Sequence, residues 1–208
     1  IRKDVSFDKA KGGFMVADPL TLYDCCPTSD GASCVILAAD HVVKQFTDDP
    51  VWVNGSAAAS DYLALHDRPS ITQLMATQNA AKKAYQMAGV AANDMDLAEV
   101  HDCFTIAELL ATEDLGFTGR GTGGRFAREG LGRRNEGDVC INPSGGLKSK
   151  GHPLGATGTG QTVEIFKQLR GEVEQSRQVR DAENALSHNV GGSGATCAVH
   201  VYGRDRNE

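Results

Sequence analysis

The sequence predicts an α/β protein in which strands and helices alternate and pack as layers. From about residue 70 onward, short apolar runs alternate with segments whose apolar residues recur every three or four positions. Three loops rich in reactive side chains follow predicted strands, at 101–104, 145–155 and 188–194. In a layered sheet such loops converge on one edge, where ligands bind.

The first 60 residues contain a β-α-β unit preceded by a polar stretch. Residues 1–29 are irregular and are interrupted by prolines. The apolar run at 32–39 is typical of a buried strand, and a second strand is expected at 51–58. Between them a short helix is expected from 40 to 46, with Asp40 as its N-cap. This unit needs neighbouring strands to bury it.

The rest of the chain continues the alternation. An amphipathic helix is expected at 70–88, where Ile71 begins the apolar face and Gly89 ends the helix. The glycine- and arginine-rich segment 118–137 is expected to be a loop or a partly helical excursion. The remaining elements expected are strands at 97–100, 139–142, 183–189 and 196–202 and helices at 105–115 and 155–169.

The composition argues against several classes of function. The chain has 208 residues, 40% of them hydrophobic, and a formal net charge of −6, whereas nucleic-acid or anionic-membrane binding needs a basic face. No apolar run approaches the ~20 residues that span a bilayer. The six cysteines are scattered without a CxxC pair, which disfavours a zinc site and suits a reducing, intracellular setting. The final residues, 203–208, are not a peroxisomal address, so a cytoplasmic location is expected.

The richest chemistry lies in a glycine-rich stretch at 142–161, which holds six of the 24 glycines. His152 lies in its middle, ahead of a proline that restricts the histidine to extended backbone geometry. A predicted helix follows, so free backbone N–H groups and a positive helix end lie close by. We therefore expect His152 to work in an active site.

Cys103 forms a thiol–imidazole combination with His101 and His152. A thiol becomes a useful acid, base or nucleophile when an imidazolium or a helix N-terminus lowers its pKa, and Cys103 comes just before a predicted helix. The backbone N–H groups of Gly191 and Gly192 are suited to stabilise a developing oxyanion.

Structural roles are open for the same side chains. His101 could cap a strand end, Cys103 could be an inert buried thiol, and His188 with Asn189 could form a turn that satisfies strand ends. The glycines at 155–160 resemble a dinucleotide-binding fingerprint. They lack a long preceding strand and a convincing ribose-binding acid, so nucleotide binding is disfavoured.

Four segments together resemble the C-terminal half of thiolases, most closely the sterol-carrier-protein type and the archaeal acetyl-CoA acetyltransferases. They span essentially the whole chain: PLTLYDCCPTSDGASCVILAAD at 19–40, HDCF at 101–104, INPSGGLKSKGHPLGATG at 141–158 and ALSHNVGGSGA at 185–195. The resemblance implies a thiolase-like layered fold with two βαβαβαββ halves. On this basis 1–29 is the end of a loop region, 30–66 the last β-α-β piece of the N-terminal half and 67–208 the C-terminal half.

The resemblance also implies roles for particular residues. His152 would activate the nucleophilic cysteine and help hold a thioester oxygen, and His101 would line the same oxyanion site. Cys103 would move the proton of the attacking acetyl-CoA carbon, and Gly191 would donate its N–H to a second oxyanion. At the position where most thiolases carry an acid/base cysteine, this chain has Asn189. The residues expected to bind substrate are Asn189, Gly151 and Phe104.

The family's nucleophilic cysteine lies in the N-terminal half, and nothing in this sequence aligns with its motif. Cys25 and Cys26 resemble the end of the loop region and are not candidates. Because family chains extend far to the N-terminal side of Ile1, which is not a methionine, we expect a piece of a longer or split protein. The expected activity is that of an acetyl-CoA C-acetyltransferase or 3-oxoacyl-CoA thiolase, which forms or cleaves a C–C bond by Claisen chemistry.

Two alternatives accompany this expectation. One is a thiolase-fold aldolase acting on steroid side-chain CoA esters, and the other is a non-catalytic thiolase-like scaffold subunit. The expected partners are an acyl-CoA substrate, the N-terminal half of the same protein, further copies in a homodimer or tetramer, and a zinc-binding OB-fold protein. The resemblance implies no metal and no redox cofactor, because the coenzyme A thioester is the substrate; neither nucleic acid nor membrane is expected.

Overall fold

The computed structural model describes residues 5–207 and is built on a five-stranded mixed sheet in the order β3-β7-β6-β4-β5. β4 runs parallel to β5 and β6, whereas β7 is antiparallel to β6 and β3. The strands are β3 (Trp52–Ser60), β4 (Leu97–Glu99), β5 (Cys140–Ile141), β6 (Asn184–Gly191) and β7 (Thr196–Gly203).

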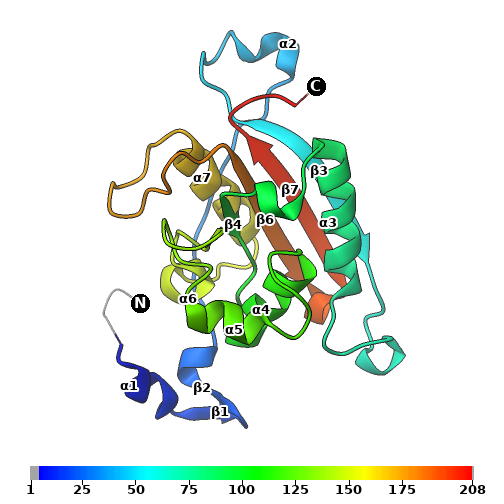
Figure 1. Cartoon of the computed structure of the whole chain (residues 1–208), viewed down its shortest axis with the longest axis vertical. Coiled ribbons are helices and arrows are strands. Elements are labelled where there is room, and N and C mark those ends of the chain that lie inside the picture. The colour runs from blue at the N-terminus through cyan, green and yellow to red at the C-terminus, as the bar shows by residue number, and fades with distance from the viewer. Residues whose placement is uncertain (1–4, 208) are drawn as a thin grey trace.

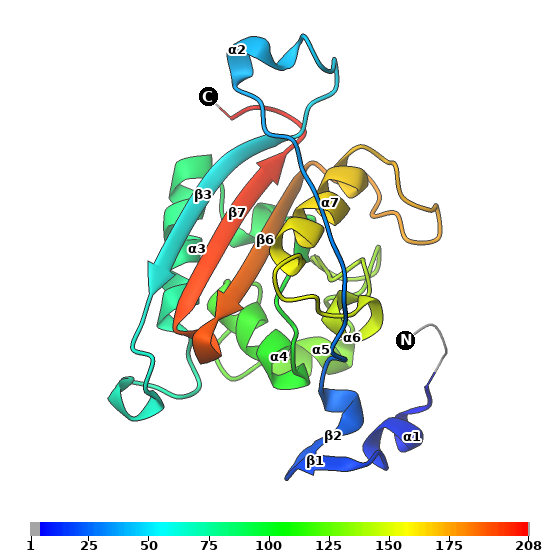
Figure 2. The same cartoon turned by 180° about the vertical axis from the view of Figure 1, so that it is seen from behind.

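Helices cover both faces of this sheet, so the α/β class expected from the sequence is confirmed. Figure 1 shows α3 on the near face, and the reverse view in Figure 2 shows α7 on the other. The helices are α1 (Phe7–Lys11), α2 (Asp40–Val43), α3 (Met75–Ala88), α4 (Thr105–Asp114), α5 (Gly123–Glu129), α6 (Gly146–Lys150) and α7 (Thr157–Leu169). None of the helices in residues 5–207 combines the length and apolar character needed to cross a bilayer.

Each face of the sheet has its own buried core, because successive residues of a strand point to opposite faces. In β4, Leu97 packs with Ile165 and Leu169 of α7, whereas Ala98 belongs to the core on the α3 side. β6 repeats this alternation with Ala185 and Leu186. This two-sided burial explains why these strands are apolar at consecutive positions.

α3 packs closely on the sheet through small side chains. Its buried face carries alanines at 76, 80, 84 and 88, spaced four residues apart. A Cβ on Gly55 of β3 would lie 2.2 Å from the Ala84 carbonyl oxygen, so only glycine fits at this crossing. The helix ends at Gly89 in left-handed geometry, as predicted, but it begins at Met75 rather than Ser70. Ile71 therefore lies before the helix and is exposed instead of facing the core.

The segment 32–39 is not the buried strand that the sequence predicts. It is extended but hydrogen-bonds to no strand in the described chain, and Ile36 is 90% exposed. Figure 2 shows it running past α7 outside the sheet, where the Ser33 hydroxyl donates to the Ala156 carbonyl at 2.7 Å. An apolar run is compatible with a strand, but a ladder also needs a partner, which residues 5–207 do not supply here. The short helix that follows begins at Asp40 with Ala39 as its N-cap, so Asp40 is not the cap.

The second predicted strand exists but has an unexpected partner. β3 pairs with β7 along its whole length and so belongs to the same sheet as the later strands. Whether this unit also completes the sheet of a preceding half stays a prediction, because β3 is the end strand of the described sheet and β7 occupies only one of its two edges. The domain boundary at 66/67 itself stays a prediction.

The remaining segments surround this core. Near the N-terminus, β1 (Met15–Ala17) and β2 (Leu20–Thr21) form a small hairpin that residues 1–29 did not reveal in sequence. The segment 118–137 contains α5, which agrees with the expectation of a partly helical excursion rather than a plain loop. The glycine-rich stretch holds a short helix, α6, ahead of α7.

Candidate active site

The three reactive loops meet at one edge of the sheet, as predicted. β4, β5 and β6 are parallel, and the first two loops follow the ends of β4 and β5, whereas the third predicted loop, 188–194, is the last part of β6 and the turn after it. The loop after β4 donates the His101 backbone N–H to His188 Nδ1 on β6, at 3.4 Å. The same loop accepts the Leu147 N–H of the glycine-rich stretch on Asp102 Oδ1, at 2.8 Å. Parallel strand direction thus brings together residues that are up to 87 positions apart.

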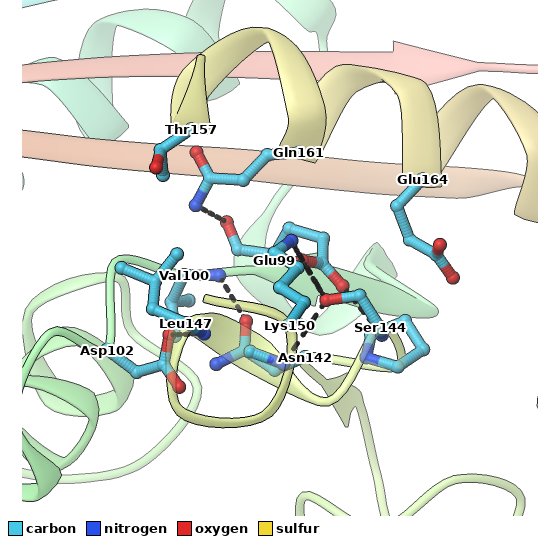
Figure 3. A network of polar contacts seen from close by, with 12 residues as sticks. Glu99, Val100, Asp102, Asn142, Ser144, Leu147, Lys150, Thr157, Gln161 and Glu164 are labelled. Atoms are coloured by element: carbon cyan, nitrogen blue, oxygen red, sulfur yellow. Dashed lines mark hydrogen bonds and ion pairs between the residues drawn. The ribbon is translucent and has the colours of Figure 1, made fainter. Parts of the chain in front are cut away.

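Asn142 and Gly146 set the path of the glycine-rich stretch. Asn142 has φ of 51°, and its side-chain oxygen accepts the Val100 N–H at 2.8 Å. Gly146 has φ of 64°, and a Cβ there would lie 2.1 Å from a carboxylate oxygen of Asp102. Figure 3 shows how these contacts hold the stretch against the end of β4.

A buried carboxylate fastens the same stretch. Glu99 of β4 accepts from the Ser144 hydroxyl at 2.7 Å and from the Ser144 N–H at 3.0 Å. Lys150 Nζ lies 2.9 Å from Glu99 Oε2 and 3.0 Å from Ser144 Oγ (Figure 3). A buried charge is tolerated when it is paired and hydrogen-bonded in this way. Glu99 carries no signal in the sequence, because one acid on a short strand has no distinctive pattern.

Gln161 connects α7 to two strands. Its buried side-chain nitrogen donates to the carbonyl oxygens of Glu99 at 3.2 Å and His188 at 3.0 Å. Its oxygen accepts from Asn189 Nδ2 at 3.2 Å. This amide therefore fixes the N-terminal part of α7, which follows His152, relative to the ends of β4 and β6.

Three imidazoles cluster at this edge. The rings of His101 and His152 contact edge to face, with centroids 4.9 Å apart. His188 is fully buried, and its Nε2 lies 3.0 Å from Thr77 Oγ1 on α3. Because His188 Nδ1 accepts an N–H, its proton resides on Nε2. Among residues 5–207, His101 Nδ1 has no hydrogen-bond partner although the residue is only 6% exposed.

Burial keeps all three imidazoles neutral at neutral pH. It lowers the pKa of His188 to about 3 and that of His101 to about 4, with the neighbouring His101 and His152, respectively, adding to the shift. Burial also lowers the pKa of His152. An imidazole with a lowered pKa has a free lone pair at neutral pH and is equipped to accept a proton.

The protonation state of the Cys103 thiol differs from the one that the sequence predicts. Burial raises the pKa of this thiol, with Cys26 and Asp102 adding to the effect, whereas the sequence predicts a lowered pKa. The expected imidazolium is missing because the histidines are neutral, and the helix that follows does not outweigh the loss of solvent. Cys103 is therefore a protonated thiol at neutral pH, which is suited to donate a proton.

Cys26 lies beside Cys103, although its sequence context did not mark it as a candidate site residue. Its backbone N–H donates to the Cys103 carbonyl at 2.9 Å, and Cys25 forms a β-bridge with Phe104. Burial raises the pKa of Cys26 as well, and Asp102 adds to this shift. These contacts run between segments about 78 residues apart, from a loop without a periodic pattern, so no local signal marks them.

The other expected residues are near the same edge, but their functions stay predictions. Gly191 ends β6 opposite Thr196, and Asn189 contacts Gln161. Gly151 has φ of 96° and a Cβ there would lie 2.3 Å from Ser29 Oγ. Backbone geometry and packing therefore explain why a glycine is present at this position. Phe104 is the last residue of the loop after β4 and is exposed. Within residues 5–207, no group of three or more His, Cys, Asp or Glu side chains is arranged to hold a metal ion.

Comparison with known proteins decides the family. The thiolase C-terminal domain-like family matches residues 57–204. This chain belongs to the thiolase family. The thiolase match begins inside β3 and extends through β7, so it contains every strand that forms the candidate site.

Curated relatives of this thiolase chain extend the match to nearly all its residues. It is 52% identical to an acetyl-CoA acetyltransferase of Methanothermobacter thermautotrophicus, over 96% of this chain and 52% of the relative. It is 41% identical to sterol carrier protein 2 of Homo sapiens, over 96% of this chain and 37% of the relative. The thiolase chain therefore spans about half the length, or less, of these curated relatives.

The fold of the thiolase chain also matches a solved structure titled Ltp2-ChsH2(DUF35) aldolase. The TM-score is 0.84 and the match covers 98% of this chain and 52% of that one. The sequences are 22% identical, so this likeness concerns the fold. It confirms the thiolase-like layered arrangement expected from the sequence.

Proposed function

We propose that this chain is the acid/base part of a thiolase-type acyltransferase, which forms or cleaves a C–C bond in CoA thioesters. The observation that carries the proposal is the contact of His101 with His152, 4.9 Å between ring centroids, beside the loop of Cys103. A neutral imidazole and a protonated thiol thus stand at one sheet edge, and general acid–base chemistry needs this combination.

The proposed cycle uses the two groups in opposite directions. In thiolysis, His152 accepts the proton of a nucleophilic cysteine on the preceding half, and the thiolate attacks the 3-oxo carbon of the substrate. The C–C bond breaks, its electron pair leaves on the acetyl-CoA carbon, and Cys103 donates its proton to that carbon. A CoA thiol then gives its proton to the Cys103 thiolate and attacks the acyl-cysteine, and the released cysteine sulfur takes back the proton from His152. Synthesis reverses these steps, with Cys103 as the base.

His101 supports the proposed thioester oxygen site. Its Nδ1 is buried without a partner in the described chain, while its backbone N–H is occupied by His188. A proton on this nitrogen would make it a donor toward a substrate oxygen through a bridging water, because the atom itself is buried. Asn189, Gly151 and Phe104 are proposed as substrate contacts, and the Gly191 N–H as donor to a second oxyanion.

The proposed partner of this chain is the preceding half of the same protein. Relatives are about twice as long as the matched region, and the apolar segment 32–39 is extended, exposed and without a strand partner in residues 5–207. An unpaired apolar segment of this kind is suited to pair with further strands. A homodimer or tetramer and a zinc-binding OB-fold partner are proposals that native mass spectrometry of the full-length protein tests.

Thiolysis of acetoacetyl-CoA by the full-length protein tests the activity. Cys103→Ala and His152→Ala should each reduce turnover by about 10²- to 10⁴-fold, the usual contribution of general acid–base catalysis. His66→Ala is the matched control, because this histidine is exposed and lies in the segment between β3 and α3. Wild-type rates in either site variant would remove the roles assigned here.

A second candidate is a thiolase-fold aldolase that cleaves steroid side-chain CoA esters. The observation that favours it is the match in fold to a structure titled an aldolase. The two activities differ in their intermediate. A thiolase forms an acyl-cysteine when it is given a 3-oxoacyl-CoA, which intact-mass measurement detects, whereas an aldolase cleaves a 3-hydroxyacyl-CoA without it. Loss of both activities in an assembled complex would instead favour the non-catalytic scaffold.

A further inference from the structure

The side chain of Thr157 contacts the His152 ring from the start of α7. Thr157 is the first residue of this helix and is 3% exposed. Its Oγ1 lies 2.7 Å from His152 Nδ1 and 3.1 Å from the carbonyl oxygen of Pro153. The hydroxyl therefore bridges the imidazole and the backbone that immediately follows it.

The two contacts of this hydroxyl determine where its proton goes. A threonine hydroxyl has one proton to donate, and a carbonyl oxygen can only accept. With the proton directed to the Pro153 oxygen, Oγ1 has lone pairs left and accepts from His152 Nδ1–H. With the proton directed to Nδ1, two oxygens would face each other at 3.1 Å with no hydrogen between them. The Pro153 carbonyl also accepts the Ala156 N–H at 2.8 Å, so the second arrangement would leave it satisfied, but only the first arrangement makes a hydrogen bond of both contacts of the hydroxyl.

We propose that Thr157 is a positioning residue whose hydroxyl holds His152 in the tautomer protonated on Nδ1, which leaves Nε2 free to accept a proton. The inference rests on the proposed function, in which His152 is the base for the nucleophilic cysteine. In that step the S–H bond breaks, its electron pair stays on sulfur and a new N–H bond forms at Nε2. The resulting imidazolium carries protons on both nitrogens, so its Nε2–H can donate to the thioester oxygen.

The surroundings of His152 favour a fixed ring. Pro153 follows it, Thr28 forms a parallel β-bridge with it, and the ring of His101 packs against it edge to face. The Pro153 carbonyl also accepts the Thr157 backbone N–H at 3.0 Å, which fixes the residue that carries the hydroxyl. The tautomer is therefore set by one hydroxyl on a rigid turn.

The tautomer can be measured directly in the full-length protein labelled with ¹⁵N-histidine. His152 is assigned by the signal lost in His152→Asn. In wild type at neutral pH, Nδ1 should have the chemical shift of a protonated nitrogen and Nε2 that of an unprotonated one. Thr157→Val, which keeps the branched shape without the hydroxyl, should lose this preference, and Thr157→Ser should retain it.

Steady-state kinetics give the second measurement. Thr157→Val should lower kcat for acetoacetyl-CoA thiolysis by about 10- to 100-fold, with KM changed little, because proton transfer is impaired and substrate contacts are not. Thr157→Ser should recover most of the rate. Thr162→Val is the matched control, since Thr162 is on the same helix but its hydroxyl contacts the Gly158 carbonyl and Tyr202.

The outcomes separate this inference from the proposed function. A wild-type protein without thiolysis activity overturns the function, and the NMR measurement still reads the tautomer. A wild-type His152 protonated on Nε2 overturns the inference, whatever the activity. Wild-type turnover in Thr157→Val, with the wild-type protein active, also overturns it.

Discussion

Removing one charge from the Glu99–Lys150 pair should have unequal effects on stability. Glu99 is 1% exposed and Lys150 is 28% exposed, with 2.9 Å between their charged atoms. Glu99 also accepts two hydrogen bonds from Ser144. Since Glu99 is on β4 and its donors are in the glycine-rich stretch after β5, the pair fastens that stretch to the sheet.

The different exposures of Glu99 and Lys150 determine which variant should lose more stability. Lys150→Met leaves a buried carboxylate without its cation, which costs about 3–5 kcal/mol. Glu99→Gln leaves an ammonium group that still reaches water, so the cost should be nearer about 1–3 kcal/mol, the range for a lost hydrogen bond to a charged group. The double variant contains neither charge and should be more stable than Lys150→Met by about 2 kcal/mol.

The measurement is the free energy of unfolding of the full-length protein in urea at pH 7. Hydrogen exchange at the Ser144 amide reports on the same contact locally and should accelerate in Lys150→Met. Lys167→Met, an exposed position on α7, is the control and should stay within about 0.5 kcal/mol of wild type. A Lys150→Met variant more stable than Glu99→Gln, or a double variant with strictly additive losses, would refute the reasoning.

Two further predictions concern histidines and glycines. Burial lowers the pKa of His188 to about 3 and that of His101 to about 4. The unfolded chain binds these protons near pH ~6.5, so stability should be complete above that pH and fall as pH drops toward 4. Replacing His188 by glutamine should flatten the decline of the free energy of unfolding by up to about 1.4 kcal/mol per pH unit, and an unchanged slope would count against its burial. Gly146→Ala should lower the thermal midpoint because its Cβ meets Asp102, whereas Gly155→Ala, with no atom within 4 Å of its Cβ, should not; equal midpoints would contradict this.

Local sequence patterns were sufficient for most of the sheet and its helices. The apolar character of β4 and β6 and the glycine after α3 are visible in sequence because burial and helix termination act over a few residues. The three reactive loops were found for the same reason, since each follows a recognisable strand. Element ends were less well predicted, as the late start of α3 illustrates.

Local patterns could not predict which distant segments pair with each other. The run at 32–39 has the composition of a strand, but whether it pairs depends on neighbours that it cannot specify. The place of β3 beside β7 likewise depends on a strand more than 130 residues later. The proximity of Cys26 to Cys103 and the bridge from Glu99 to Lys150 belong to the same class of long-range contact.

The sequence by itself determined the layered α/β class, because side-chain type and local spacing encode it, and its resemblance to a family supplied the roles expected of the site residues. Only the tertiary structure decided how those residues behave. The protonated state of Cys103, the neutral histidines and the Thr157 contact to His152 all depend on burial and on hydrogen-bond partners from other elements. A pKa and a tautomer are properties of surroundings, and folding sets those surroundings.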